Sequence, residues 1–190
     1  MESVTLAGRL GKTAHLSALL MKVRRLGLAS PSDLERLAVS RGLRYYDSHG
    51  DSLKNGVSPL HGSDGRISGE FTNEELAIAL FSPSAPYSQQ RLRMGAAMLA
   101  AEGNRPESIA NRAVRERCEA VVRHIASCGR EVEPENPFWE KLLELIPAGH
   151  SELPPDALPH PTRFVAMTGI TRKGVGNLKQ WIRPRAPLPS

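Results

Sequence analysis

Five side chains that can bind metals or move protons lie in one glycine-rich stretch, residues 45–70. This stretch contains five glycines and no hydrophobic period, and a loop of this length is usually functional or disordered. Carboxylates and imidazoles together suit Zn²⁺, Mn²⁺ or Fe²⁺, but metal ligands need a rigid frame, and no scaffold is visible here. We therefore expect a solvated loop with no metal or other cofactor, and we keep a metal-dependent hydrolase as a third alternative. The five residues are Asp47, His49, Asp51, His61 and Asp64.

The tetrapeptide Gly50-Asp51-Ser52-Leu53 lies in the same stretch. It resembles the sequence that names the GDSL hydrolases, and the resemblance implies an α/β fold with Ser52 as nucleophile. The rest of the chain departs from that pattern. Asp156 and His160 are four residues apart, where the family has three, and the apolar runs of a parallel sheet are missing. We therefore expect no serine hydrolase, since short motifs often match by chance.

Residues 8–13 resemble part of a phosphate-binding loop, because Gly11, Lys12 and Thr13 follow one another. The full pattern needs a glycine five residues before Gly11, where this chain has Leu6. It also needs a buried strand before the loop. We expect only a glycine-containing segment ahead of a helix.

The charged residues are divided unevenly along the chain. The formal net charge is +5 and the pI about 9.6. Residues 1–30 carry five basic side chains and one acidic one, residues 131–157 carry one basic and seven acidic, and residues 158–190 carry six basic and none acidic. In this last segment cations could contact phosphates and aromatic rings could stack on bases. The candidate nucleic-acid-binding residues are Arg163, Arg172, Lys173, Lys179, Trp181, Arg183 and Arg185.

This charge pattern favours a non-enzymatic binding protein that contacts nucleic acid through its basic termini. The alternative is a protein–protein interaction or accessory module, in which the acidic block docks the basic tail or a basic partner.

No membrane partner is expected, since no apolar run approaches the ~18 residues of a membrane span. Cys118 and Cys128 lie ten residues apart in one expected helix, too far apart for a disulfide. A reducing, cytoplasmic location is therefore expected.

Two helices are expected before the glycine-rich stretch, and they would form an N-terminal helical hairpin over residues 1–44. The first spans about Thr13 to Leu26, with leucines at three- and four-residue spacing and Gly27 as terminator. The second has Ser30 as N-cap and Pro31 at the first helical position.

A helical body is expected over residues 71–147. Thr72 and Glu75 have capping-box spacing at its start. Further helices are expected over about 87–101 and 105–128, and after Asn136. On the 105–128 helix, one apolar stripe should be buried: Ala110, Val114, Cys118, Val121, Ile125 and Cys128.

Two segments have some features of a helix-turn-helix. Residues 33–43 resemble its first half, but a glycine-rich stretch follows where the recognition helix should be. Residues 109–125 lack a turn glycine and are expected to be one continuous helix. For both segments we favour ordinary helix packing over a helix that binds in a DNA groove.

The C-terminal part differs in character from the body. Residues 148–161 are proline-rich and predict a linker. In residues 162–190, segments 163–168 and 178–183 read as short strands separated by glycines, which predicts a basic hairpin and tail. The expected fold is thus mainly α, a bundle of about five helices, followed by a proline-rich linker and a small basic β-hairpin.

Overall fold

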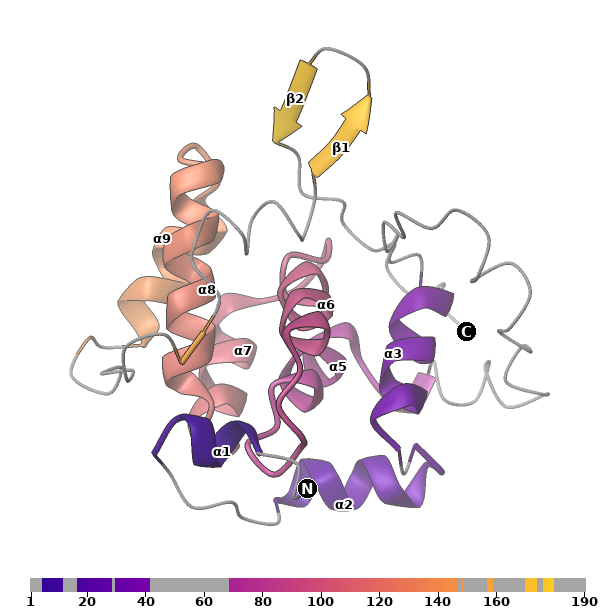
Figure 1. Cartoon of the computed structure of the whole chain (residues 1–190). Helices are drawn as coiled ribbons and strands as arrows, with labels where there is room; N and C mark the ends of the chain where they lie inside the picture. Colours follow the sequence, from indigo (N-terminus) through magenta and orange to yellow (C-terminus); the bar gives the residue numbers. More distant parts are fainter. Residues whose placement is uncertain are drawn as a thin grey trace.

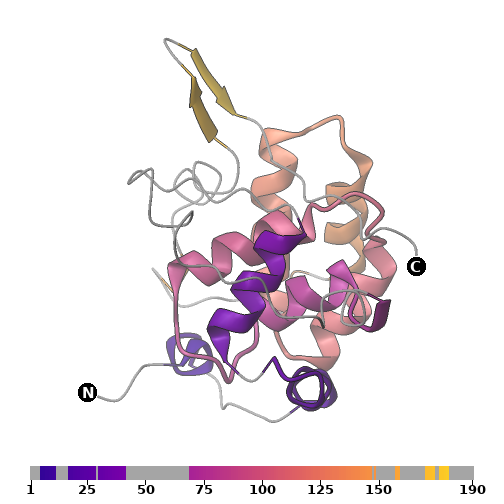
Figure 2. The same ribbon diagram turned by 90° about the vertical axis from the view of Figure 1, so that its right-hand side faces the viewer.

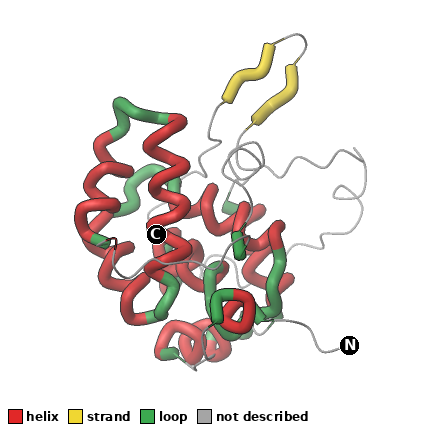
Figure 3. Tube along the Cα trace, turned by 60° about the vertical axis from the view of Figure 1, so that its left-hand side comes forward, coloured by secondary structure: helices red, strands yellow, loops and turns green. Residues whose placement is uncertain are grey.

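The computed structural model describes residues 5–11, 17–28, 30–41, 69–146, 148, 157–158, 170–173 and 176–179. Eight helices and two strands lie within these residues (Figures 1 and 3), so the prediction of a mainly helical protein is confirmed. The expected number of about five helices is too low. The helices are α1 (Leu6–Arg9), α2 (Ala18–Arg25), α3 (Pro31–Ser40), α5 (Asn73–Leu80), α6 (Gln89–Leu99), α7 (Pro106–Arg115), α8 (Glu119–Val132) and α9 (Pro137–Leu145).

Helix α5 is the centre of the molecule, and every one of its residues is buried. The capping box of Thr72 and Glu75 forms as expected and fixes where the helix begins. Helices α2, α3, α6 and α7 all contact α5. The closest of these contacts is with α6, where Gly95 lies beneath the Phe81 ring. A Cβ on Gly95 would come within 2.4 Å of that ring, so only glycine allows the two helices to approach this closely.

Helices α2 and α3 lie on one side of α5 (Figure 2). Helix α3 begins as expected, with a capping box of Ser30 and Asp33 and Pro31 in its first turn. Helix α2 begins later than expected, at Ala18 instead of Thr13. The Ser17 hydroxyl accepts a hydrogen bond from the Leu20 amide and caps the helix there.

The expected continuous helix over residues 105–128 is wrong. The chain divides it into α7 and α8, and Arg117 between them has a φ of 56°, in the left-handed region. The Cys118 amide donates to the Ala113 carbonyl, which closes α7. The prediction missed this break because no glycine marks it.

The break also changes which side chains are buried. Helix α7 buries Ile109, Ala110 and Ala113, whereas Val114 is 58% exposed. Val114 was expected in the buried stripe, and that prediction is wrong. Because the chain turns at Arg117, side chains before and after this residue no longer lie on one face of a single helix. The other five members of the stripe are buried: Ala110, Cys118, Val121, Ile125 and Cys128.

Helix α9 packs against α7 and α8. Asn136 caps its start, as expected. The Trp139 indole lies over Gly129 of α8, where a Cβ would come within 2.4 Å of the ring. At the other end of α9, the Arg123 guanidinium donates to the carbonyls of Leu143 and Ile146. These contacts join α8 and α9 into one pair.

Two short strands lie near the C-terminus. Strand β1 (Ile170–Lys173) pairs antiparallel with β2 (Gly176–Lys179), Ile170 opposite Lys179. The strands were expected over 163–168 and 178–183. The first of those ranges lies outside the described residues. Of the second, only Leu178 and Lys179 are described, and both lie in β2, which begins at Gly176. Of the expected linker, Ala157 is buried against the body, and its carbonyl accepts from Arg9 Nε at 3.1 Å.

No helix among the described residues is long and apolar enough to cross a membrane.

Candidate functional site

The seven candidate residues of the basic tail are only partly covered by the structure. The backbones of Arg172 and Lys173 lie on β1, and that of Lys179 lies on β2. Arg163, Trp181, Arg183 and Arg185 lie outside the described residues. The prediction that they bind nucleic acid stays a prediction.

The Asp and His side chains of the glycine-rich stretch also lie outside the described residues: Asp47, His49, Asp51, His61 and Asp64. Within the described ranges, no three His, Cys, Asp or Glu side chains come together in a way that could hold a metal ion. Both cysteines are buried, and neither forms a disulfide. Burial, helped by the charge of Glu131, raises the pKa of Cys128 to about 11, so this thiol stays protonated and is a poor nucleophile.

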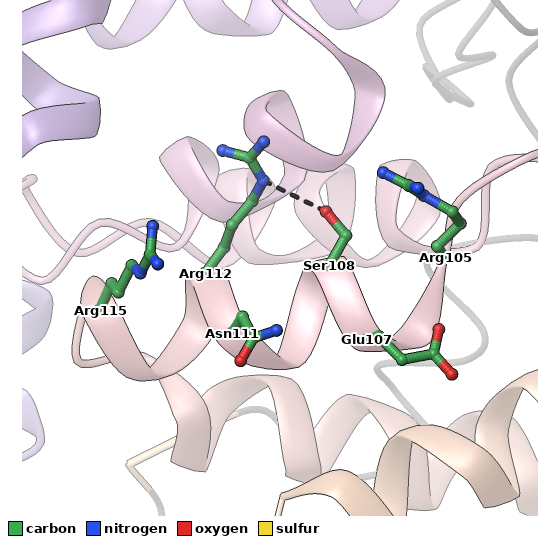
Figure 4. A pocket seen from close by; sticks show the side chains of 6 residues that line it. All are labelled: Arg105, Glu107, Ser108, Asn111, Arg112 and Arg115. Atoms are coloured by element: carbon green, nitrogen blue, oxygen red, sulfur yellow. Dashed lines mark hydrogen bonds between the residues drawn. The ribbon is translucent and has the colours of Figure 1, made fainter.

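A polar depression with a volume of about 570 Å³ lies over α7. Figure 4 shows its lining side chains, which come from α7 and from the residue before it. Arg105, Ser108, Arg112 and Arg115 follow at spacings of three and four residues, which places them on one face of the helix. Asn111 and Glu107 complete the lining.

Two buried carboxylates at the start of α5 hold this face in place. Glu75 Oε1 accepts from Arg112 Nη1 at 3.1 Å, and Glu75 Oε2 accepts from Lys22 Nζ of α2 at 2.9 Å. Burial acts to raise the pKa of Glu75, but hydrogen bonds from Lys22 and the Thr72 amide, with the charges of Lys22 and Arg112, bring it below its usual value of 4.5. This carboxylate therefore stays charged and links α2, α5 and α7.

Glu74 makes the second connection to α7. Its Oε1 accepts from the Arg105 amide at 2.9 Å and lies 3.8 Å from Arg105 Nε. Its Oε2 accepts from the Ser108 hydroxyl and lies 3.9 Å from Arg112 Nε. The side chains of two arginines of the depression are thus oriented from beneath by a rigid, buried helix.

The carboxylates do not neutralise the face completely. Arg105 is 77% exposed despite its contact with Glu74. Arg115 is exposed and has no hydrogen bond or ion pair with any residue that the structure describes. Lys22, Arg105, Arg112 and Arg115 together outnumber Glu74 and Glu75. The depression is therefore electropositive, with only Glu107 acidic at its rim.

This arrangement is suited to holding an anion. Guanidinium groups present fixed forks of N–H donors that match phosphate and carboxylate oxygens, and the Asn111 amide adds two further donors. The Ser108 hydroxyl, by contrast, is already engaged, since it donates to Glu74 and accepts from Arg112 Nε at 3.4 Å. Among the described residues that line the depression there is no histidine that could activate it as a nucleophile.

This site was not identified from the sequence. The signal was present as the spacing of Arg105, Arg112 and Arg115. What the sequence could not show was the contribution of α5, because Glu74 and Glu75 read as ordinary first-turn acids of that helix.

No family model, curated protein or solved structure matches this chain.

Proposed function

We propose that the protein is a non-enzymatic nucleic-acid-binding protein that contacts the phosphate backbone through α7, together with the basic segment 158–190. The observation that carries this proposal is the electropositive depression lined by Arg105, Arg112 and Arg115. The six basic and no acidic residues of 158–190 add a second set of cations on the same chain.

The length of the α7 face suits several phosphates at once. Arg105 and Arg115 are ten residues apart, which is about 15 Å along a helix axis. A nucleic-acid strand in a duplex carries one charge per ~3.4 Å of its axis, so this span corresponds to about four phosphates. A single small anion would engage only part of the face.

The contacts we propose are with phosphates and not with base edges. A helix-turn-helix would read bases with the second helix of the pair. Here the second helix, α8, packs on α9 and buries seven of its residues in the core, among them Val121 and Ile125. The basic residues of the depression lie on α7 and directly before it, so we expect weak sequence preference and a strong dependence on salt.

Fluorescence anisotropy with labelled single-stranded and duplex oligonucleotides at 50 mM salt tests the proposal. The double variant Arg105→Gln/Arg115→Gln should bind at least about tenfold more weakly, because the loss of even one charged donor in a good contact costs ~1.5–3 kcal/mol. The matched control Arg130→Gln/Lys141→Gln removes the same charge from exposed positions on α8 and α9. It should bind within about twofold of the wild type. Equal effects of the two double variants would overturn the role of α7.

A protein-binding module is the second candidate, and the acidic surface of α8 and α9 favours it. Four exposed glutamates lie along the end of α8, the following turn and α9: Glu131, Glu135, Glu140 and Glu144. If the wild-type protein binds no oligonucleotide at 50 mM salt, the nucleic-acid proposal is wrong. We would then expect the basic segment to dock on these glutamates or on an acidic partner, and Glu140→Lys/Glu144→Lys should abolish contacts to the acidic surface in cross-linking.

A further inference from the structure

A second cavity, with a volume of about 160 Å³, is lined by residues of α2, α3, α6 and the C-terminal part of α5 and by residues between these helices. The arrangement of these helices can be followed in Figures 1 and 2. Most of its wall is apolar and comes from four different segments. The apolar lining includes Leu20, Val23, Leu28, Leu34, Ala79 and Pro86.

A buried cation, Arg91, lines this cavity, and the other polar lining residues are Arg24, Ser30, Ser82 and Ser84. Arg91 of α6 is only 4% exposed. Its guanidinium has five N–H donors, yet it makes a single hydrogen bond, from Nη1 to the Pro86 carbonyl at 3.3 Å. Its Nε is buried with no partner. Burying a charge with few hydrogen-bond partners is unfavourable, and this side chain has donors left for a further acceptor.

No carboxylate of the described residues pairs directly with Arg91. Glu35 of α3 is the acidic group that interacts with it electrostatically, but no ion pair within 4 Å forms. Burial raises the pKa of Glu35, and the charge of Arg91 only partly opposes this. Glu35 therefore compensates the guanidinium incompletely.

A second polar group of the cavity also has no partner. Ser82, which follows α5, is 3% exposed, and its hydroxyl oxygen forms no hydrogen bond. Ser82 and Arg91 both line the same cavity. Two buried polar side chains with unused hydrogen-bonding capacity thus share one small apolar space.

We propose that this cavity binds a small aliphatic carboxylate, with its carboxylate group at Arg91 and Ser82 and its hydrocarbon part against the leucine-lined wall. The guanidinium fork matches the two oxygens of a carboxylate, and the hydroxyl supplies a further donor. The hydrocarbon part would remove apolar wall from water, which inorganic phosphate cannot do.

The size of the cavity limits the ligand. A water molecule occupies about 30 Å³ in the liquid, so the cavity holds the equivalent of about five waters. This suits an acid of about four to six carbons. The site is separate from the α7 face, so its test is independent of nucleic-acid binding.

Isothermal titration of the full-length protein tests the proposal with butyrate and isovalerate as probes. Both should bind saturably at one site, with affinities in the range of about 0.1–10 mM, as the limited contact area of such small ligands allows. Butylamine, which has a similar size and the opposite charge, and inorganic phosphate should show no saturable binding. If neither acid saturates by about 20 mM, or if the amine binds equally well, the proposal is wrong.

Substitutions of Arg91 test whether the acid binds in this cavity. Arg91→Met should lower the affinity for isovalerate at least about tenfold, the effect of losing a hydrogen-bonded charge, and should leave the melting temperature without ligand unchanged or higher. Arg93→Met is the matched control, because Arg93 lies on the same helix and also has a buried, unpartnered Nε but does not line the cavity.

Isovalerate should bind Arg93→Met as it binds the wild type. Arg91→Lys keeps the charge without the planar fork, and it should retain weaker binding and a folded protein. Unchanged affinity in either Arg91 variant would contradict the site, since both remove the fork that we place on the carboxylate.

Discussion

Arg117 adopts a backbone conformation that favours glycine. Its φ of 56° is followed by the Cys118 amide bonding back to the Ala113 carbonyl, so the residue ends α7 and lets α8 start in a new direction. A left-handed conformation costs a residue with a Cβ about 1–2 kcal/mol. The chain thus stores local strain at the turn between these two helices.

Replacing this arginine by glycine should relieve that strain. We expect Arg117→Gly to raise the free energy of unfolding by about 0.5–1 kcal/mol, because part of the gain is lost to the greater freedom of glycine in the unfolded chain. Arg130→Gly makes the same change at an exposed position inside α8. It should lower the free energy by about 1 kcal/mol. Urea denaturation measures both, and two changes of the same sign would contradict the strain at Arg117.

Glu75 makes the stability of the fold dependent on pH. Its pKa is lower in the folded protein than the usual 4.5, so below pH 4.5 the unfolded chain takes up the proton first. The stabilisation is therefore complete above the unfolded pKa and is lost as the pH falls through the folded pKa.

Glu75→Gln should remove this dependence. We expect the variant to be about 1–3 kcal/mol less stable near neutral pH, as its partners Lys22 and Arg112 lose their charged acceptor. Its stability should then fall less steeply than that of the wild type from pH 5 downward. Urea titrations at several pH values measure both effects. Glu140→Gln, at an exposed position on α9, is the control. If both substitutions changed the pH dependence of stability below pH 5 equally, Glu75 would not be its source.

At the scale of the elements, three helix starts were predicted correctly from the sequence. Ser30, Thr72 and Asn136 are short polar side chains that cap the helices they precede, as expected. These signals are local, so they can be identified without knowledge of the fold. The break at Arg117 is different, because the residue type argues against it and the helices that it separates, α7 and α8, both pack against α9, far along the sequence from α7.

The buried and exposed faces of α7 and α8 give a direct test of that break. Val121→Asp places an unpaired charge in the core, where the side chain is fully buried, and should cost several kcal/mol or prevent folding. Val114→Asp makes the same change on the exposed side of α7. It should cost less than about 1 kcal/mol, mostly from the negative end of the helix dipole.

Thermal melts followed by circular dichroism compare the two variants. In one continuous helix both valines would share a buried stripe, and the two substitutions would be similarly damaging. A large loss of stability in Val114→Asp would therefore contradict the division into α7 and α8.

The candidate site could be predicted from the sequence less completely than the fold could. The basic character of segment 158–190 is visible from composition, but the α7 depression depends on carboxylates more than thirty residues away. Glu74 and Glu75 reach Arg105 and Arg112 only because α5 is buried beside α7. The same holds for the cavity at Arg91, whose lining comes from four segments. Periodicity within one helix carries no information about such contacts.

At the scale of the whole molecule, charge is distributed unevenly. Arginines line the depression on α7, exposed glutamates lie at the end of α8 and on α9, and segment 158–190 carries basic residues and no acidic ones. Local charge density matters more to a polyanion than net charge does. A net charge of +5 therefore understates how strongly the basic surfaces would attract nucleic acid.

The measurement that most directly tests nucleic-acid binding through α7 is the salt dependence of oligonucleotide affinity. Each phosphate neutralised contributes about −0.7 to −0.9 to the slope of log K against log salt concentration. With four to six contacts, the wild-type slope should be about −3 to −5. Arg105→Gln/Arg115→Gln should make it shallower by about 1.4–1.8, and Arg130→Gln/Lys141→Gln should leave it unchanged. A wild-type slope near zero, or one that the α7 variant leaves unaltered, would contradict this account.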